Sequence, residues 1–301
     1  MSILLSVIIP TYNRKDSLSK CLYALTNQHT KIKYEVLIID DGSTDNTDEV
    51  IKKWEKNTHF KLRYFRQENK GPASARNIGI KQARGDILLF IGDDIIATPN
   101  LIEKHMVFHC KYPEENVAML GYVTWSSEIK VTPFMYWLEH GGPQFQYYKF
   151  KHREKVKAFW TCNISLKRSF LIKEGYFDED FPYAAYEDTE LGYRLQKKGL
   201  QIIYNKNAIA YHYHSTNIEK YCYRQKLVGK SFIILHKKYP VIFKMPLENN
   251  NVKKNVWVIF KFIVPYLKNI AIILDRKNIK LPNILYKIIM HYYYQKGIQE
   301  K

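Results

Sequence analysis

The first 120 residues alternate short, wholly apolar runs with segments of helical periodicity. The clearest apolar runs are LLSVIIP at 4–10, YEVLIID at 34–40 and DILLFIG at 86–92. The segments between them, such as NRKDSLSKCLYALTNQ, space their apolar residues as an amphipathic helix does. Strands that do not alternate are buried on both faces, so this order predicts a mostly parallel sheet with helices on both sides. The chain is expected to be an α/β protein.

Polar residues stand where these expected strands end. The pairs at the strand ends are Pro10 with Thr11, Asp40 with Asp41, and Asp93 with Asp94. Ligands of such sheets bind at the carboxyl ends of the strands, so these pairs should gather along one rim. Two adjacent carboxylates repel each other unless a cation or hydrogen-bond donors compensate them, and a divalent ion bound with ligand phosphates would do so. An isolated Asp-Asp pair is explained more simply as a turn, so the neighbouring motifs must decide.

Several further motifs occur in a fixed order along the chain. They are SVIIPTYNR, VLIIDDGSTDNT, GPASARNIGI, ILLFIGDD, FWTCNISLKRS, GYFDEDFP, YEDTELGYRLQKKG and AIAYHYH. Together they resemble the family 2 glycosyltransferases, which have the GT-A fold with a Rossmann-like nucleotide-binding sheet. The likeness implies a catalytic domain over 1–216, with a nucleotide-sugar half at 1–120 and an acceptor half at 121–216. A basic, mainly helical extension at 217–301 lies outside it.

The resemblance implies a nucleotide-sugar site on the rim. The residues that it assigns to this ligand are Pro10, Thr11, Asp41, Arg76, Asn77, Asp93, Trp160 and Asn163. The family's metal motif is usually Asp-x-Asp, whereas Gly92 stands at its first position here. By likeness, Asp94 is then the metal ligand and Asp93 contacts the ribose or the donor sugar. Trp160 is equally expected as a core residue.

A histidine late in the chain is implied as the second metal ligand. In AIAYHYH at 208–214, alternation along a strand puts His212 and His214 on one face. The family often completes its metal site at this point, and His212 matches best, with His214 second. A carboxylate, a neutral imidazole and two phosphate oxygens suit Mn²⁺ or Mg²⁺.

The segment YEDTELGYRLQKKG at 186–199 predicts a helix over about 188–198 that ends at Gly199. Acids in a first helical turn are ordinarily stabilising caps, but the helix dipole also keeps a carboxylate ionised, as a general base requires. The resemblance implies that Asp188 is the base that deprotonates the acceptor hydroxyl in an inverting transfer. It implies that Glu187 holds the acceptor.

The residues from 217 to 301 include 17 Lys and Arg against four Asp and Glu, so most of the net charge of +18 lies there. The run at 256–274 is apolar, but Lys261 and Lys268 interrupt it, and each charge near the centre of a span costs roughly 2.5–3.5 kcal/mol. This run should therefore not cross a bilayer. The amphipathic, cationic and aromatic stretch at 275–297 predicts a helix on an anionic membrane surface. The alternative is a helical subdomain that packs on the catalytic domain or on a second copy of the chain, as a homo-oligomer.

These features predict an inverting, metal-assisted glycosyltransferase. It would move a sugar from a nucleotide-diphosphate sugar, expected to be a UDP-sugar, to a hydroxyl of a surface glycan or its lipid-linked precursor. The N-terminus has no basic leader region, and the four cysteines are scattered, so a cytoplasmic protein is expected. Lipid binding by the basic region would put it at the inner face of the plasma membrane.

Other function classes fit the sequence less well. A sugar-1-phosphate nucleotidyltransferase normally has a Gly-rich loop after the first strand, and PTYNR contains no glycine. No nucleic-acid-binding motif accompanies the positive charge, so nucleic acid is not expected as a partner. A binding protein with the same fold and no transfer activity stays open.

Overall fold

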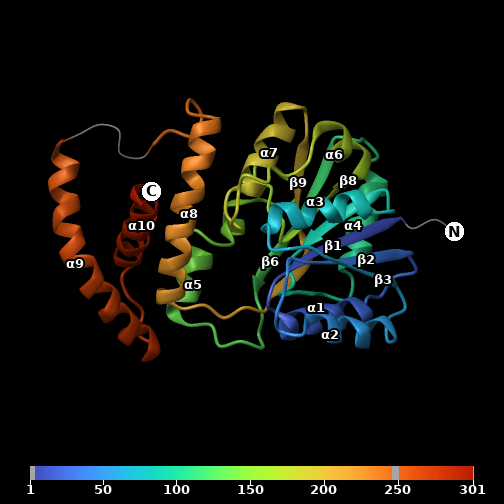
Figure 1. The fold of residues 1–301 in the computed structure, drawn as a ribbon, viewed down its shortest axis with the longest axis horizontal. Coiled ribbons are helices and arrows are strands. Elements are labelled where there is room, and N and C mark those ends of the chain that lie inside the picture. Colours follow the sequence, from blue (N-terminus) through green and yellow to red (C-terminus); the bar gives the residue numbers. More distant parts are fainter. Residues whose placement is uncertain (1–3, 246–250, 301) are drawn as a thin grey trace. The chain divides into compact units, whose positions relative to one another are not determined.

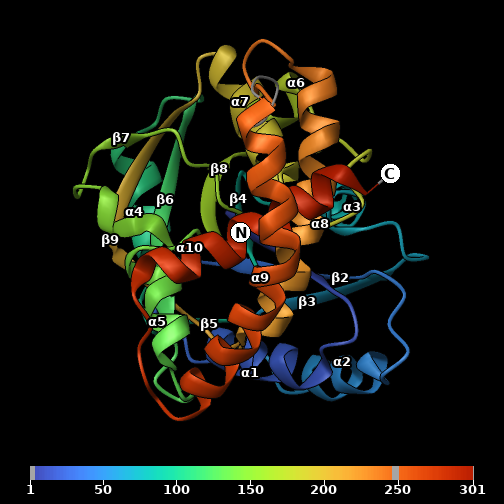
Figure 2. The same ribbon diagram turned by 90° about the vertical axis from the view of Figure 1, so that its left-hand side faces the viewer.

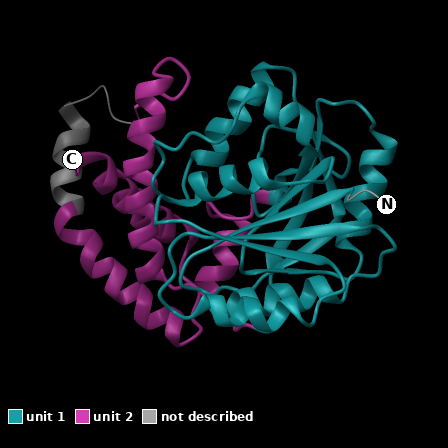
Figure 3. Ribbon diagram, turned by 45° about the vertical axis from the view of Figure 1, so that its right-hand side comes forward, with its two compact units in different colours: residues 1–128, 147–214 teal, residues 129–146, 215–301 magenta. Residues whose placement is uncertain are grey.

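The computed structural model describes residues 4–245 and 251–300. It describes side chains for all of these residues except 251–260. Contacts divide the chain into two compact units (Figure 3). Unit 1 contains residues 1–128 and 147–214, and unit 2 contains residues 129–146 and 215–301. The sequence placed 129–146 in the catalytic domain. The structure joins this segment to the C-terminal residues instead, because its helix packs among theirs.

Within the described residues, unit 1 is built on a nine-stranded mixed sheet with the order β3-β2-β1-β4-β8-β6-β9-β5, and β7 pairs with β9. The strands are β1 (Leu5–Thr11), β2 (Tyr34–Asp40), β3 (Lys61–Arg66), β4 (Ile87–Ile91), β5 (Ile95–Ala97), β6 (Val117–Trp125), β7 (Lys155–Val156), β8 (Asn163–Lys167) and β9 (Gln201–His212). The first four strands are parallel, whereas β8 is antiparallel to both β4 and β6. Every residue of β2 and β4 is buried, as their largely apolar, non-alternating sequences predicted.

Helices cover both faces of this sheet (Figure 1). They are α1 (Lys15–Thr26), α2 (Thr47–Glu55), α3 (Pro72–Gln82), α4 (Leu101–Lys111), α6 (Arg168–Glu174) and α7 (Glu187–Lys197), with a short 3₁₀ helix at Gln146–Lys149. α1 and α2 lie on one face, and α3 lies on the other (Figure 1). α4 lies on the face of α1, where His105 contacts Asn163 and Ser165 of β8. α3 approaches the sheet closely at Gly79, where a Cβ atom would collide with the side chain of Ile8. The expected α/β class is confirmed.

Unit 2 is helical in its described part. Its helices are α5 (Pro133–His140), α8 (Ile218–Lys238), α9 (Asn251–Arg276) and α10 (Asn283–Gln299), of which α8, α9 and α10 pack together (Figure 2). The ring of Phe134 in α5 lies 5.8 Å from Tyr221 and 5.5 Å from Tyr286, measured between centroids. The Asp275 carboxylate accepts a hydrogen bond from the backbone N–H of Phe134 at 2.8 Å. These contacts explain why α5 belongs to this unit.

Part of the basic region packs within its own unit. Tyr286, Ile289 and Met290 of α10 are buried within unit 2, whereas Ile284 is 59% exposed. Part of the apolar side of α10, expected from the sequence to lie on a membrane, is therefore used for packing. Among the described residues, we find no helix whose length and hydropathy would let it cross a bilayer. The first side chains of the apolar run at 256–274 lie outside the described ones.

Candidate functional site

The strand ends of β1 and β4 meet as predicted. Pairing of β1 with β4 brings Thr11 close to the segment after β4, and the Thr11 hydroxyl donates to Asp93 Oδ2 at 2.8 Å. Asp93 and Asp94 are only 5% and 7% exposed, so both carboxylates are held away from solvent. Buried carboxylates need compensating charge or donors. The rim therefore concentrates negative charge in a sheltered position.

Two basic side chains provide that compensation. Arg14 Nη1 lies 2.6 Å from Asp94 Oδ2 and 3.4 Å from Asp93 Oδ1. His212 Nε2 lies 3.4 Å from the same Asp94 Oδ2 atom. Antiparallel pairing of β5 with β9 sets Ile95 opposite His212, which explains why the residue before Ile95 meets this imidazole. Sequence reasoning missed Arg14, whose only sign was its place directly after the PTYN turn.

The two carboxyl groups have opposite pKa shifts. Burial, and then the charge of Asp94, raise the pKa of Asp93 to about 7. Burial also acts to raise the pKa of Asp94, but His212, Arg14 and His214 outweigh it and lower that pKa. Asp94 is therefore the carboxylate that stays ionised, which a metal ligand requires.

Asp94 and His212 fit a divalent cation that also has phosphate ligands. Ligands of an octahedral cation at about 2.1 Å stand roughly 3 Å apart, near the observed 3.4 Å between these two atoms. In the described part of the chain, no cluster of three or more His, Cys, Asp or Glu side chains forms a metal site by itself. Oxygens of a bound ligand would have to complete the shell. At Gly92, a Cβ atom would lie 2.8 Å from Asp94 Oδ1, so the glycine leaves Asp94 room.

Asp41, at the end of β2, organises the loop before α3. Its carboxylate accepts hydrogen bonds from the backbone N–H groups of Lys70 and Gly71, at 2.8 and 2.9 Å, and from the Gln67 amide at 2.6 Å. Gly71 has φ +89°, in the left-handed region that glycine adopts without strain. Asp41 therefore shapes this part of the rim.

A second acidic pair, Glu187 and Asp188, stands at the start of α7, which begins one residue earlier than predicted. Glu187 is 2% exposed and accepts from Arg76 Nη1 at 2.9 Å, a buried ion pair that joins α3 to α7. Its other oxygen, Oε2, is buried and has no hydrogen-bond partner in the described part of the chain. Tyr186, just before the helix, has φ +69°, a conformation that costs a non-glycine residue energy and is frequent at functional sites.

Cys162 lies within electrostatic range of both acidic groups. Burial raises the pKa of its thiol to about 12, and the charges of Asp188 and Asp94 add to this effect. Asp188 itself is half-buried in the first turn of α7. The predicted base and the predicted metal ligand thus both act electrostatically on one thiol, although they are 94 residues apart in sequence.

Asn163 and Asn77, two residues predicted to bind the nucleotide-sugar, form hydrogen bonds with other residues of the protein. Asn163 is fully buried, and its amide bonds to His105 Nε2 at 2.9 Å and to the backbone oxygens of Tyr122 and Ala208. Asn77 bonds to the Phe177 backbone through both its oxygen and its nitrogen, at 2.9 Å each. Because these amides are already saturated by the protein, they hold the fold around the site.

Two further residues predicted to bind the nucleotide-sugar, Pro10 and Trp160, are partly exposed. Pro10 is half-buried within β1, one residue before Thr11. Trp160 is half-buried as well and packs edge-on against Tyr147, with centroids 4.8 Å apart. Trp160 is thus part of an aromatic cluster and still has an exposed portion.

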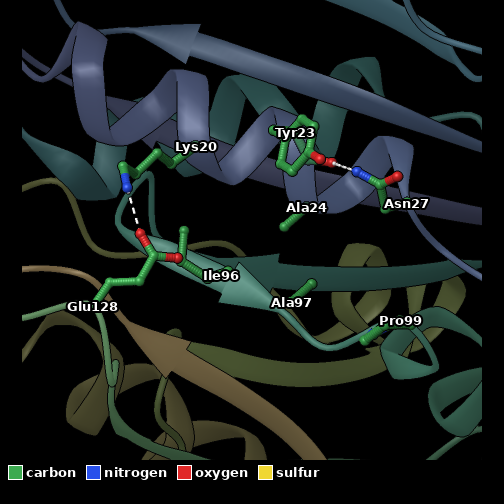
Figure 4. A pocket seen from close by; sticks show the side chains of 8 residues that line it. All are labelled: Lys20, Tyr23, Ala24, Asn27, Ile96, Ala97, Pro99 and Glu128. Atoms are coloured by element: carbon green, nitrogen blue, oxygen red, sulfur yellow. Dashed lines mark hydrogen bonds and ion pairs between the residues drawn. The ribbon is translucent and has the colours of Figure 1, made fainter.

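A pocket of about 540 Å³ lies between α1 and β5 (Figure 4). It is lined by Lys20, Tyr23, Ala24, Asn27, Ile96, Ala97, Pro99 and Glu128. Lys20 and Glu128 form an ion pair (Figure 4). No residue predicted for the site lines this pocket, so the chemistry of the rim and the volume of the pocket are separate features.

Comparison with known proteins adds a family likeness. Residues 6–177 match the family model described as Glycosyl transferase family 2. A validoxylamine A glucosyltransferase of Streptomyces hygroscopicus subsp. jinggangensis is 31% identical over 241 residues, covering 68% of this chain and 54% of the relative. A chondroitin synthase of Escherichia coli is 26% identical over 285 residues, covering 83% of this chain and 41% of the relative. The chain thus spans about half the length of these relatives.

Solved structures share the architecture. The mannosyltransferase PcManGT of Pyrobaculum calidifontis, in complex with GDP-Man and Mn²⁺, has a TM-score of 0.60 at 15% identity and covers 98% of this chain and 85% of its own. Staphylococcus aureus TarS 1–349, in complex with UDP, has a TM-score of 0.54 at 18% identity, with coverages of 98% and 90%. Such identities show the fold alone. The GT-A arrangement expected from the sequence is confirmed.

Proposed function

Because the chain belongs to glycosyl transferase family 2, we propose that it transfers a sugar from a nucleotide-diphosphate sugar to a hydroxyl of a glycan acceptor. The observation that carries this proposal is the pairing of Asp94 with His212 at the rim of unit 1. It is supported by Asp188, whose charge acts on Cys162 together with that of Asp94. A cation-binding pair and an ionisable carboxylate are the two devices that an inverting transfer needs.

The donor is proposed to be a UDP-sugar bound along the rim, with Thr11, Asp41 and Asp93 nearest to its nucleoside and sugar. This choice is supported by S. aureus TarS, whose solved complexes contain UDP and UDP-GlcNAc. PcManGT was solved with GDP-Man, so GDP-sugars are the competing class.

Asp94 and His212 would hold Mn²⁺ or Mg²⁺ together with the donor diphosphate. A cation bound there neutralises the charge of the leaving diphosphate. Asp93 lies beside Asp94 with its carboxyl oriented by Thr11, so it is the group available to the ribose or the donor sugar.

Asp188 is proposed to be the general base. It would accept the proton of the acceptor hydroxyl while that oxygen attacks the anomeric carbon and the nucleoside diphosphate leaves, which inverts the configuration. The N-terminal end of α7 favours the ionised carboxylate. Glu187 Oε2, buried and lacking a partner in the described residues, is suited to accept a hydrogen bond from the acceptor.

The acceptor is proposed to be a surface glycan or its lipid-linked precursor, met at the inner face of the plasma membrane. α9 supports this location. Its Phe262 and Tyr266 side chains are 70% and 73% exposed, whereas Val264 and Ala271 on the opposite side are fully buried. One side of α9 thus packs within unit 2, and the other presents aromatic rings.

Exposed basic residues lie before and after this part of α9 in the sequence. The exposed basic residues from 261 to 280 are Lys261, Arg276, Lys277 and Lys280. The one acidic residue in this range, Asp275, is buried and bonded to α5. Aromatic rings flanked by lysines and arginines suit the interface of an anionic bilayer.

A thermal-shift screen of UDP, GDP, dTDP and CDP, each with and without Mn²⁺, tests the donor site. UDP with Mn²⁺ is expected to stabilise the protein most, since a ligand at one hundred times its Kd adds about 2.7 kcal/mol. Asp94→Asn should remove the Mn²⁺-dependent part of this shift. Failure of all four nucleotides to shift the melting temperature would contradict the proposal.

A further inference from the structure

Arg14 stands in the path of the proposed cation. Its Nη1 atom lies 2.6 Å from Asp94 Oδ2, the oxygen that also faces His212 Nε2 at 3.4 Å. A divalent ion held by Asp94 and His212 would need this oxygen. A guanidinium and a divalent cation repel each other strongly at such a distance. Both therefore cannot occupy Asp94 Oδ2 in their best geometry.

The backbone around Arg14 is held firmly. Asn13 has φ +52°, and its side chain accepts from the Thr44 N–H at 2.7 Å. The N–H of Lys15 donates to Asp45 Oδ2 at 3.0 Å. Asn13 and Lys15 thus tie both flanks of Arg14 to the loop after β2. Any movement of Arg14 must come from its side chain.

That side chain has room to move. Its exposed fraction is 40%, against 7% and 10% for the side chains of Asp93 and Asp94. The carboxylates are therefore fixed in the rim, whereas the guanidinium reaches them from a partly open position. An arginine released here would remain close to Asp94, where the diphosphate is proposed to bind with the cation, and guanidinium groups bind phosphates well.

We propose that Arg14 is a displaceable counter-cation. In the metal-free protein it neutralises Asp93 and Asp94, and when a divalent cation binds at Asp94 it leaves Oδ2 and turns to the donor diphosphate. This inference rests on the proposed cation site. It links metal binding to diphosphate binding, because the cation displaces Arg14 from Asp94 and the diphosphate then binds the released guanidinium.

Arg14→Gln in the full chain tests the displacement. Without nucleotide, the variant is expected to bind Mn²⁺ about tenfold more tightly than the wild type, as measured by the free Mn²⁺ signal in electron paramagnetic resonance, because a charge-assisted competitor is lost. In EDTA its melting temperature should fall, since two sheltered carboxylates lose their partner, and Mn²⁺ should restore it. At saturating Mn²⁺, the affinity for UDP should decrease.

Arg66→Gln is the matched control. Arg66 ends β3, is half exposed and lies 4.0 Å from Asp40, so its loss removes the same charge without touching Asp93 or Asp94. Its Mn²⁺ affinity should stay within about twofold of the wild type. If Arg14→Gln does not fold in EDTA, Arg14→Lys, which cannot bridge both carboxylates, should show the same changes at smaller size.

The outcomes separate this inference from the proposed function. Equal Mn²⁺ affinity of Arg14→Gln and the wild type would overturn the counter-cation while leaving the cation site intact. Unchanged UDP affinity at saturating Mn²⁺ would overturn the move to the diphosphate. UDP binding without any Mn²⁺ binding, in wild type and variant alike, would overturn the proposed cation site and the role of Arg14 together.

Discussion

At the scale of single residues, Asp93 links the rim to pH. Burial and the charge of Asp94 raise its pKa to about 7, whereas the aspartates of an unfolded chain have a pKa of about 3.9. The folded protein thus binds the Asp93 proton more tightly than the unfolded chain does. The protonated carboxyl therefore contributes stability that is present below about pH 4 and is lost as the pH rises to about 7. Asp93→Asn should therefore be more stable than the wild type at pH 8 in EDTA, by as much as about 4 kcal/mol, and similar near pH 4.

Urea denaturation at the two pH values measures this difference. Asp86→Asn is the control, because Asp86 is an exposed aspartate directly before the same strand β4. It should change stability little at either pH. If the free energy of unfolding of Asp93→Asn differs from that of the wild type by the same amount at both pH values, the raised pKa of Asp93 is contradicted.

Asp188 belongs to the same scale. Asp188→Asn keeps the size of the side chain but cannot accept a proton, so turnover with a UDP-sugar and acceptor should fall by about 10² or more. UDP binding with Mn²⁺ should stay nearly unchanged. Asp180→Asn, at an exposed aspartate in the loop before α7, is the control and should keep full turnover. Substantial transfer by Asp188→Asn would assign the base to another group.

At the scale of elements, α8 and α10 cross at two glycines. A Cβ atom on Gly297 would collide with the Lys226 backbone oxygen, and one on Gly229 would collide with that of Tyr294. Because backbone cannot yield as a flexible side chain does, Gly297→Ala should destabilise unit 2 by about 1–3 kcal/mol. Gly141→Ala in the same unit, where the nearest atom would be 3.6 Å away, should be tolerated. Thermal unfolding followed by circular dichroism compares the two, and equal melting temperatures would show that the helices separate at no cost.

At the scale of the whole molecule, the exposed side of α9 is expected to bind anionic lipid. The full chain should sediment with phosphatidylserine-containing vesicles at low salt and be released at high salt. Replacing Phe262 and Tyr266 by serine together should weaken binding about tenfold or more, because each buried aromatic ring contributes roughly 1.5–3 kcal/mol.

A matched control comes from another exposed apolar pair in unit 2. Val241 and Ile242 are 78% and 52% exposed in the segment after α8, and their replacement by serine should leave vesicle binding unchanged. Failure of the full chain to sediment at low salt would refute lipid binding. A dimer in light scattering that the Phe262 and Tyr266 replacements dissociate would assign this side of α9 to a second copy of the chain instead.

Much of the site could be predicted, because its residues follow local signals. Asp93 and Asp94 stand where an apolar strand stops, and Asp188 stands in the first turn of a periodic helix. Arg14 gave no such signal, since its partners are 79 and 80 residues away in sequence. Asn163 was misjudged for the same reason, because only the packing of α4 against β8 supplies His105 as its partner.

The sequence by itself determined the first four strands, the first three helices and the meeting of their polar ends, because the periodicity of apolar residues and the parallel order of strands are local properties. Only the tertiary structure decided which charges meet. The pairing of β5 with β9 sets His212 beside Asp94, and the packing of α5 with α8 and α10 assigns 129–146 to unit 2. The physical reason is that such contacts join segments far apart in the chain, and apolar periodicity marks which face of an element is buried but not what it is buried against.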